Sequence, residues 1–274
     1  MNKVDTSPQW ARPQTVKKLN LPKWTLVNED IPVRHCGDMK LALEKMRKNF
    51  FFMSENWLSQ DGVCDNDFMN TIIVRNPMQR LISHYRHIYR TVDNELKYKF
   101  VTKNPDPVFN VTFMLENFDL ISDNYYARSL NGKENFLLPY GLAGKSEEVL
   151  TTALEELHKF DWILIIGEDG QENESENNDF ILTRGVGLSK GLGMERVQPR
   201  NTKYLSDHDE NILLELNALD SKIWEEAKKL HALDVLSLQM MIKHGGHIVE
   251  NYKKKESDKC CGHLCRSVEE GVES

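Results

Sequence analysis

Short runs of apolar residues alternate along the chain with segments whose apolar residues recur at helical spacing. The runs at residues 50–53, 71–74 and 162–166 are continuous, as expected for strands that are buried on both faces of a sheet. Residues 77–90 follow one of these runs with a helical pattern, and Pro77 suits the first turn of a helix. Short buried strands that alternate with helices predict an α/β fold with three layers, in which helices flank a mainly parallel central sheet.

The same periodicity predicts the other elements. Asp207 and Glu210 have the spacing of a capping box, and the helix after them would bury an apolar stripe formed by Ile212, Leu213, Leu216 and Leu219. The helix at residues 77–90 would turn Leu81, Ile82, Tyr85, Ile88 and Tyr89 toward a core. A short strand is expected at residues 24–27, and further helices are expected at residues 38–48, 108–117, 122–130, 146–158 and 221–243 and around Phe180.

The pattern also suggests where the domain begins and ends. Residues 1–30 contain Pro8, Pro13 and Pro22 among polar residues and are expected to form an irregular lead-in. Residues 31–245 are expected to form one α/β domain, followed by a charged, cysteine-containing flexible tail at residues 246–274.

Charge narrows the range of binding partners. The chain has 274 residues, with 35 Lys and Arg against 42 Asp and Glu, so its formal net charge is -7. This balance argues against a protein dedicated to nucleic acid or to anionic membranes, and we expect no nucleic-acid partner. Any site for an anion must therefore be local.

Hydropathy and cysteine usage bear on the cellular compartment in which the protein is found. The apolar runs are far shorter than the roughly 18 residues that a membrane-spanning helix needs, so no transmembrane segment is expected. Taken as complete, the chain would stay in the cytoplasm. Cys36 and Cys64 are solitary in the sequence, while Cys260, Cys261 and Cys265 lie in the tail, a spacing that leaves the redox compartment open.

The most informative segment runs from residue 71 to residue 85. Arg75 would stand at the carboxyl end of a strand, and Arg80 and Ser83 would lie in the first turns of the next helix. In a parallel sheet, this junction offers unpaired N–H groups and a helix dipole that attract anions. A guanidinium and a hydroxyl could thus converge there on one phosphate group.

This segment resembles the 3′-phosphate-binding motif of sulfotransferases, Arg-x-Pro-x-x-Arg-x-x-Ser followed by an aromatic residue. The matching positions are Arg75, Pro77, Arg80, Ser83 and Tyr85. The resemblance implies a P-loop-like fold in which Arg75 and Ser83 bind the 3′-phosphate of 3′-phosphoadenosine 5′-phosphosulfate, the co-substrate that donates the sulfuryl group. Arg80 would support the site.

Three further segments resemble Golgi-type carbohydrate sulfotransferases in the same order, so that the resemblance spans residues 50–230. They are Asp123-Asn124-Tyr125 with Arg128 and Leu130; Phe160-Asp161 with residues 163–166 and Glu168; and residues 213–228, which include Asn217 and Asp220. The resemblance implies transfer of a sulfuryl group to a hydroxyl, with carbohydrate as the expected acceptor and the Golgi lumen as the expected location.

The chain departs from the family upstream. Sulfotransferases of this kind have a loop resembling Pro-Lys-x-Gly-x-Thr, which holds the 5′-phosphosulfate and stabilises the leaving phosphate. Residues 31–38 occupy this place in the order but lack the Lys and the Thr, and Asp38 would repel an anion. Either Arg34 substitutes for the lysine, or the chain is truncated or mis-spliced at its start, or catalysis has been lost.

The general base stays open at this stage. Sulfuryl transfer to a hydroxyl suits a His or a Glu with a raised pKa, and the candidates are His35, Glu168, His84 and His208. Arg200 belongs to a basic stretch that could close over the nucleotide. No metal is required, and the glycine-rich residues 185–193 suggest a lid or a linker instead of a dinucleotide loop.

Two other functions compete with an active sulfotransferase. The first is a non-catalytic nucleotide-binding protein that keeps the 3′-phosphate site after losing the 5′ loop. The second is an RNA-binding protein that uses Arg75, Arg80, Arg86 and Arg90, against which the acidic net charge counts.

Overall fold

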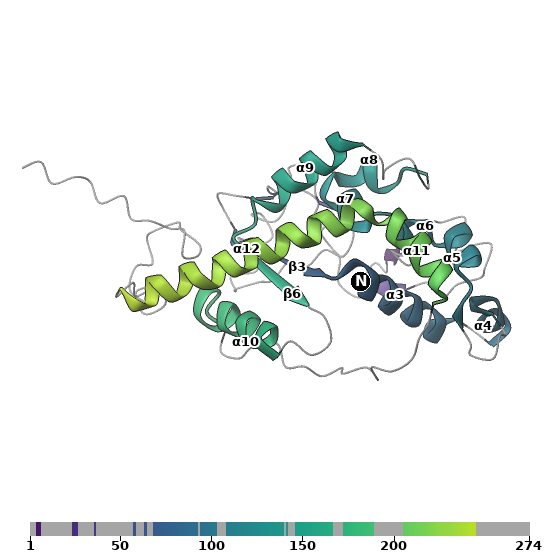
Figure 1. The fold of residues 1–274 in the computed structure, drawn as a ribbon, viewed down its shortest axis with the longest axis horizontal. Helices are drawn as coiled ribbons and strands as arrows, with labels where there is room; N and C mark the ends of the chain where they lie inside the picture. Colours follow the sequence, from purple (N-terminus) through teal and green to yellow (C-terminus); the bar gives the residue numbers. More distant parts are fainter. Residues whose placement is uncertain are drawn as a thin grey trace, which may run out of the picture. The chain divides into compact units, whose positions relative to one another are not determined.

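The computed structural model describes residues 4–6, 24–26, 36, 57–58, 63–64, 68–92, 94–102, 108–139, 141, 146–166, 172–188 and 205–244 (Figure 1). The chain divides into two compact units. The first comprises residues 1–62, 75–157 and 198–226, and the second comprises residues 63–74, 158–197 and 227–274.

The first unit is mainly helical. Its helices are α3 (Pro77–Thr91), α4 (Asn94–Phe100), α5 (Val111–Asn117), α6 (Asp119–Ser122), α7 (Tyr125–Leu130), α8 (Gly132–Phe136), α9 (Glu147–Leu157), α11 (Asp207–Leu216) and the start of α12 (Ala218–Lys243). Two antiparallel strand pairs accompany them: β1 (Val4–Thr6) with β2 (Trp24–Leu26), and β4 (Val101–Thr102) with β5 (Val108–Phe109).

The core of the first unit forms along α3. Leu81, Tyr85 and Ile88 are fully buried, as their helical spacing predicted, and they pack with the aromatic rings of Phe100 and Phe118. The helix begins at Pro77, as predicted, and ends at Thr91. Periodicity therefore identified both the helix and the face that it buries.

The second unit contains the parallel strands. β3 (Thr71–Arg75), whose last residue belongs to the first unit, pairs with β6 (Trp162–Ile166). α10 (Glu172–Phe180) leads into a π-helical turn, η1 (Ile181–Gly185). The core of this unit is formed by Trp162, Leu164, Ile181, Leu182, Val235 and Leu238. Figure 1 shows α10 beside β6, where the side chain of Asn178 bonds both the N–H and the C=O of Ile165.

The described elements are consistent with an α/β fold, but the parallel sheet among the described residues has only two strands. The strand predicted at residues 50–53 and the helix predicted at residues 38–48 lie outside the described residues. The prediction that these two strands are buried on both faces was wrong in part, because Ile73 and Ile166 are 47% and 46% exposed. A continuous apolar run thus identified each strand without revealing which of its residues is covered.

Two predicted helices are shorter in the structure because asparagines interrupt them. The segment at residues 108–117 begins as β5, and the Asn110 side chain then caps α5 by accepting a hydrogen bond from the Phe113 N–H. The segment at residues 122–130 breaks at Asn124, which adopts a left-handed conformation with φ 44° before α7 begins. Asparagine tolerates this conformation better than most residues.

The helix after Asp207 also differs from its prediction. Its N-cap is Ser206, whose hydroxyl accepts a hydrogen bond from the Asp209 N–H, so the predicted Asp207–Glu210 capping box is wrong. Leu213 is fully buried while Leu216 is only partly buried. The helix ends at Leu216, and Leu219 belongs to α12.

The predictions for residues 24–27, 146–158, 162–166 and 221–243 are confirmed as β2, α9, β6 and α12, with bounds that differ by a few residues at most. Within the described ranges, no helix combines the length and the apolar character needed to cross a membrane.

Two glycines of the glycine-rich stretch have structural roles in the second unit. Gly187 has a φ of +82°, which favours glycine. A Cβ atom built on Gly185 would lie 2.5 Å from Cζ2 of the Trp162 ring, which is fully buried. Gly185 is therefore required for close packing.

We expect Gly185→Ala to lower the free energy of unfolding by about 1–3 kcal/mol, because the added methyl group overpacks the Trp162 ring. Chemical denaturation measures this change. The double variant Gly185→Ala/Trp162→Phe removes the clashing ring atoms and should cost less than the sum of the two single changes. Strictly additive losses would contradict this account of Gly185.

Candidate anion-binding site

The junction between β3 and α3 contains the predicted phosphate ligands. Arg75 is the last residue of β3, and Asn76 caps α3 by accepting hydrogen bonds at its side chain from the Met78 and Gln79 N–H groups. The Arg80 N–H donates to the Asn76 carbonyl, and Pro77 has no N–H. The unpaired N–H groups expected here are thus already bonded, so an anion would depend on side chains and on the helix dipole.

Ser83 and Arg75 are the side chains suited to that task. Ser83 is partly exposed on α3, and its hydroxyl has no hydrogen-bond partner within the described part of the chain. Arg75 is partly buried, and its backbone N–H donates to the phenol oxygen of Tyr126 at 2.8 Å. A serine hydroxyl with no protein partner and an arginine at a strand end are suitable donors for an oxyanion.

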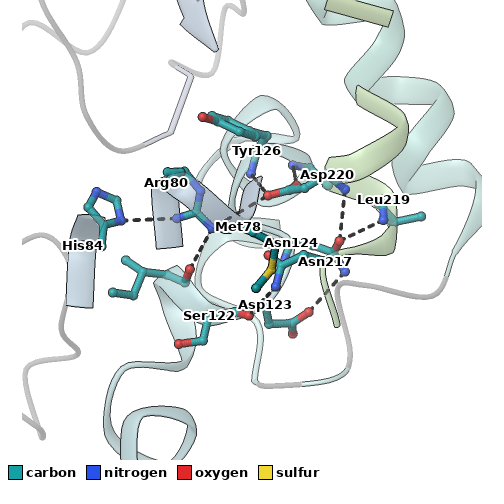
Figure 2. Close-up of polar contacts among 12 residues, drawn as sticks. Met78, Arg80, His84, Ser122, Asp123, Asn124, Tyr126, Asn217, Leu219 and Asp220 are labelled. Atoms are coloured by element: carbon teal, nitrogen blue, oxygen red, sulfur yellow. Dashed lines mark hydrogen bonds and ion pairs between the residues drawn. The ribbon is translucent and has the colours of Figure 1, made fainter. Parts of the chain in front are cut away.

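Arg80, by contrast, is committed to protein groups, as Figure 2 shows. The side chain is 6% exposed, and Nη2 donates to the Ile121 carbonyl at 2.9 Å and lies 4.0 Å from the Asp220 carboxylate. The guanidinium also lies over the rings of Tyr125 and Tyr126, at 4.7 and 5.5 Å from their centres. These contacts hold the Arg80 side chain against the protein, and its supporting role at a phosphate site stays a prediction.

His84 is poorly placed to act as a general base. Arg80 Nη1 lies 3.2 Å from His84 Nδ1, and because a guanidinium can only donate, Nδ1 is the acceptor and the proton is on Nε2. Burial, with Arg80 as the second cause, lowers the pKa of His84 to about 3. The ring is therefore a neutral hydrogen-bond donor at physiological pH.

The starts of α7 and α12 cap each other, which Figure 2 shows in detail. The Asn124 side-chain oxygen accepts hydrogen bonds from the N–H groups of Leu219 and Asp220. In return, the Asp220 carboxylate accepts from the N–H groups of Tyr126 and Ala127. Each helix thus receives the cap for its second and third N–H groups from the other helix.

Asn217 completes this arrangement. Its side-chain oxygen accepts from the Asn124 N–H at 3.2 Å, and its amide group donates to the carbonyls of Ser122 and Leu213. Burial raises the pKa of Asp220, and the Arg80 guanidinium and the two amide donors oppose that rise. The cluster of Arg80, Asn124, Asn217 and Asp220 is named the buried polar network below.

A second buried ion pair holds the chain after α7. Arg128 Nη2 lies 2.6 Å from the Asp123 carboxylate, and both side chains are at most 1% exposed. Arg128 also donates to the carbonyls of Phe136 and Leu138, while Asp123 accepts from the Gly141 N–H. The pair thereby holds the end of α8 and the residues that follow it.

The four segments that carry the family resemblance make hydrogen bonds or ion pairs within the units to which they belong. Three of them meet in the first unit through the buried polar network and its neighbour Asp123. The fourth contains Asp161, whose carboxylate accepts from the Asn70 N–H and whose own N–H donates to the Asn70 carbonyl, just ahead of β6 and β3. This pairing sets the relative start of the two strands.

The sequence did not single out Tyr126. Its hydroxyl lies against the Arg75 backbone, whereas the motif at residues 123–130 draws attention to the adjacent Tyr125. No spacing rule would have separated the two tyrosines, because their difference depends on contacts with distant parts of the chain.

Several predicted site residues stay untested. Arg34, His35, Glu168 and Arg200 lie outside the described residues, and His208 is exposed in the first turn of α11. The described ranges contain no group of three or more His, Cys, Asp or Glu side chains arranged to hold a metal ion.

The cysteines add an observation that sequence spacing did not predict. Cys36 and Cys64, which are solitary in the sequence, are both disulfide-bonded. Disulfides are typical of proteins in oxidising compartments.

We expect Asp220→Ala to lower the free energy of unfolding by about 3–5 kcal/mol, because it leaves the Arg80 guanidinium buried without its carboxylate. Two helix N–H groups would lose their acceptor as well. Urea denaturation measures the change. Glu215→Ala removes an exposed carboxylate from α11 and should change stability by less than about 0.5 kcal/mol. A similar small loss in both variants would contradict the importance of the network.

A comparison with models of protein families found one match. Residues 23–133 match the family model described as the sulfotransferase family, a range that includes Arg75, Ser83 and the segment around Asn124. No curated protein and no solved structure matches the chain. The match covers less than half of the chain, and it supports, in general terms, a sulfotransferase-type transferase.

Proposed function

We propose that this chain binds 3′-phosphoadenosine 5′-phosphosulfate and transfers its sulfuryl group to a hydroxyl of a carbohydrate. The observation that carries the proposal is that Arg75 ends β3 and Ser83 follows on α3, within the segment that matches the sulfotransferase family. The guanidinium and the hydroxyl would hold the 3′-phosphate. Arg80 would act indirectly by keeping α3 in place.

The proposed chemistry is an in-line displacement at sulfur. The acceptor hydroxyl oxygen forms a bond to sulfur, and the bond between sulfur and the 5′-phosphate oxygen breaks. Its electron pair leaves with the phosphate, giving adenosine 3′,5′-bisphosphate, while a base takes the acceptor proton. His35 and Glu168 are the proposed bases, since the hydrogen bond from Arg80 disfavours His84.

The acceptor and the compartment are proposed from the resemblance to Golgi-type carbohydrate sulfotransferases. Disulfide-bonded Cys36 and Cys64 support an oxidising lumen such as that of the Golgi.

A catalytically impaired nucleotide-binding protein is the second candidate, and one specific observation favours it. Residues 31–38 lack the Lys and Thr that the family uses to stabilise the leaving phosphate, and Arg34 is the cation nearest to that position in the sequence. Binding could survive this loss because Arg75 and Ser83 are present. Nucleotide binding and transfer therefore need separate tests.

For binding, we expect adenosine 3′,5′-bisphosphate to associate with the protein and Arg75→Ala to weaken this association by about ten- to hundredfold, since one charge-assisted contact is lost. Isothermal titration calorimetry measures both affinities. Arg90→Ala, which removes an exposed arginine from the same helix, is the matched control and should leave the affinity unchanged. Equal affinities for the Arg75→Ala variant and the unsubstituted protein would refute the assignment.

For transfer, we expect turnover about a hundred- to a thousandfold below that of an intact sulfotransferase, because preorganised charge stabilisation is missing. Transfer of radiolabelled sulfate to a panel of glycans measures it. Rates typical of intact enzymes would overturn this expectation and would indicate Arg34 as the substitute cation. Arg34→Ala should then abolish transfer.

A further inference from the structure

The hydroxyl of Tyr126 has an unusual position at the end of β3. Its oxygen accepts the Arg75 N–H at 2.8 Å, and because an amide can only donate, the phenol proton needs an acceptor of its own. In the part of the chain that the structure describes, that proton has no acceptor. Tyr126 is nevertheless only 8% exposed.

The rest of the residue is held firmly. The Tyr126 N–H donates to the fully buried Asp220 carboxylate at 3.0 Å, and the Arg80 guanidinium lies over the ring. Figure 2 shows the ring pointing away from Asp220, so that the hydroxyl lies at the far end of the side chain. The buried polar network therefore fixes the backbone and the ring of Tyr126 and leaves only the phenol proton uncommitted.

We propose that the Tyr126 hydroxyl is a third donor to the oxyanion that Arg75 and Ser83 bind. The inference rests on the proposed function, and it assigns to the 3′-phosphate site a residue outside the motif that suggested the site. Accepting the Arg75 N–H places the phenol oxygen beside Arg75, and the phenol proton is left for an acceptor near the same residue. A phosphate oxygen there would receive a charge-assisted hydrogen bond.

The protonation state of Tyr126 agrees with this role. Burial raises the pKa of Tyr126 to about 12, and the Arg80 guanidinium opposes the rise. The phenol therefore keeps its proton at physiological pH and acts as a neutral donor. Because the phenol is neutral, it would not repel a nearby anion as a phenolate would.

The test compares two nucleotides that differ only in the 3′-phosphate. Tyr126→Phe removes the hydroxyl and keeps the ring under Arg80. We expect its affinity for adenosine 3′,5′-bisphosphate to fall by about ten- to hundredfold, while its affinity for adenosine 5′-monophosphate changes by less than about twofold. Calorimetric titrations of the full chain, with displacement for the weaker ligand, give both values.

Tyr89→Phe is the matched control. Tyr89 lies on α3 in the first unit, outside the motif, and its ring packs against the ring of Phe100 with 6.4 Å between their centres. This variant loses the same oxygen atom as Tyr126→Phe. Its affinity for adenosine 3′,5′-bisphosphate should stay within about twofold of the unsubstituted protein.

The outcomes separate this inference from the proposed function. If Arg75→Ala weakens bisphosphate binding and Tyr126→Phe does not, Tyr126 is no ligand and the nucleotide site stands. If Tyr126→Phe weakens the binding of both nucleotides equally, the role of Tyr126 is structural and the inference is overturned. If the unsubstituted protein binds no adenosine 3′,5′-bisphosphate, the nucleotide site and the Tyr126 assignment fail together.

Discussion

The carboxylate of Asp220 is completely buried in the first unit, where it accepts two backbone N–H groups and faces the guanidinium of Arg80. A buried carboxylate without such partners would be very costly, so the groups around it must stay in place for the unit to remain folded. Asp220 thereby ties the start of α7 to the start of α12 and, through Arg80, to α3. The position of the candidate anion site depends on this one group.

This arrangement separates residues that hold the site from residues that could contact a ligand. Arg80, Asn124, Asn217 and Asp220 use their polar atoms on one another and on helix ends. Ser83 keeps a hydroxyl with no protein partner in the described residues, and Tyr126 keeps a phenol proton. A polar network that is largely satisfied internally can place such donors precisely at little cost, because its own members do not compete for the ligand.

In the proposed function, nucleotide binding and sulfuryl transfer would depend on different parts of the chain. The proposed 3′-phosphate site is built from α3 and its neighbours, all within or close to the segment that matches the sulfotransferase family. Stabilisation of the leaving phosphate would fall to residues 31–38, whose sequence lacks the family's Lys and Thr. A protein of this kind could retain nucleotide recognition while its rate of transfer falls, since the two contributions come from separate groups.

The sequence alone determined the elements whose signals are local. The periodicity of residues 77–90 identified α3 and its buried face, and the run at residues 162–166 identified β6, because each pattern is set by neighbours a few positions apart. The motif also singled out Arg75 and Ser83. Tertiary structure decided the rest: Asn124 and Asp220 cap helix N–H groups that lie 93 to 96 positions away, and Asp220 also faces the buried Arg80. No local pattern encodes such pairings, so the capping at Asn124, the commitment of Arg80 and the place of Tyr126 emerged only when distant segments packed together.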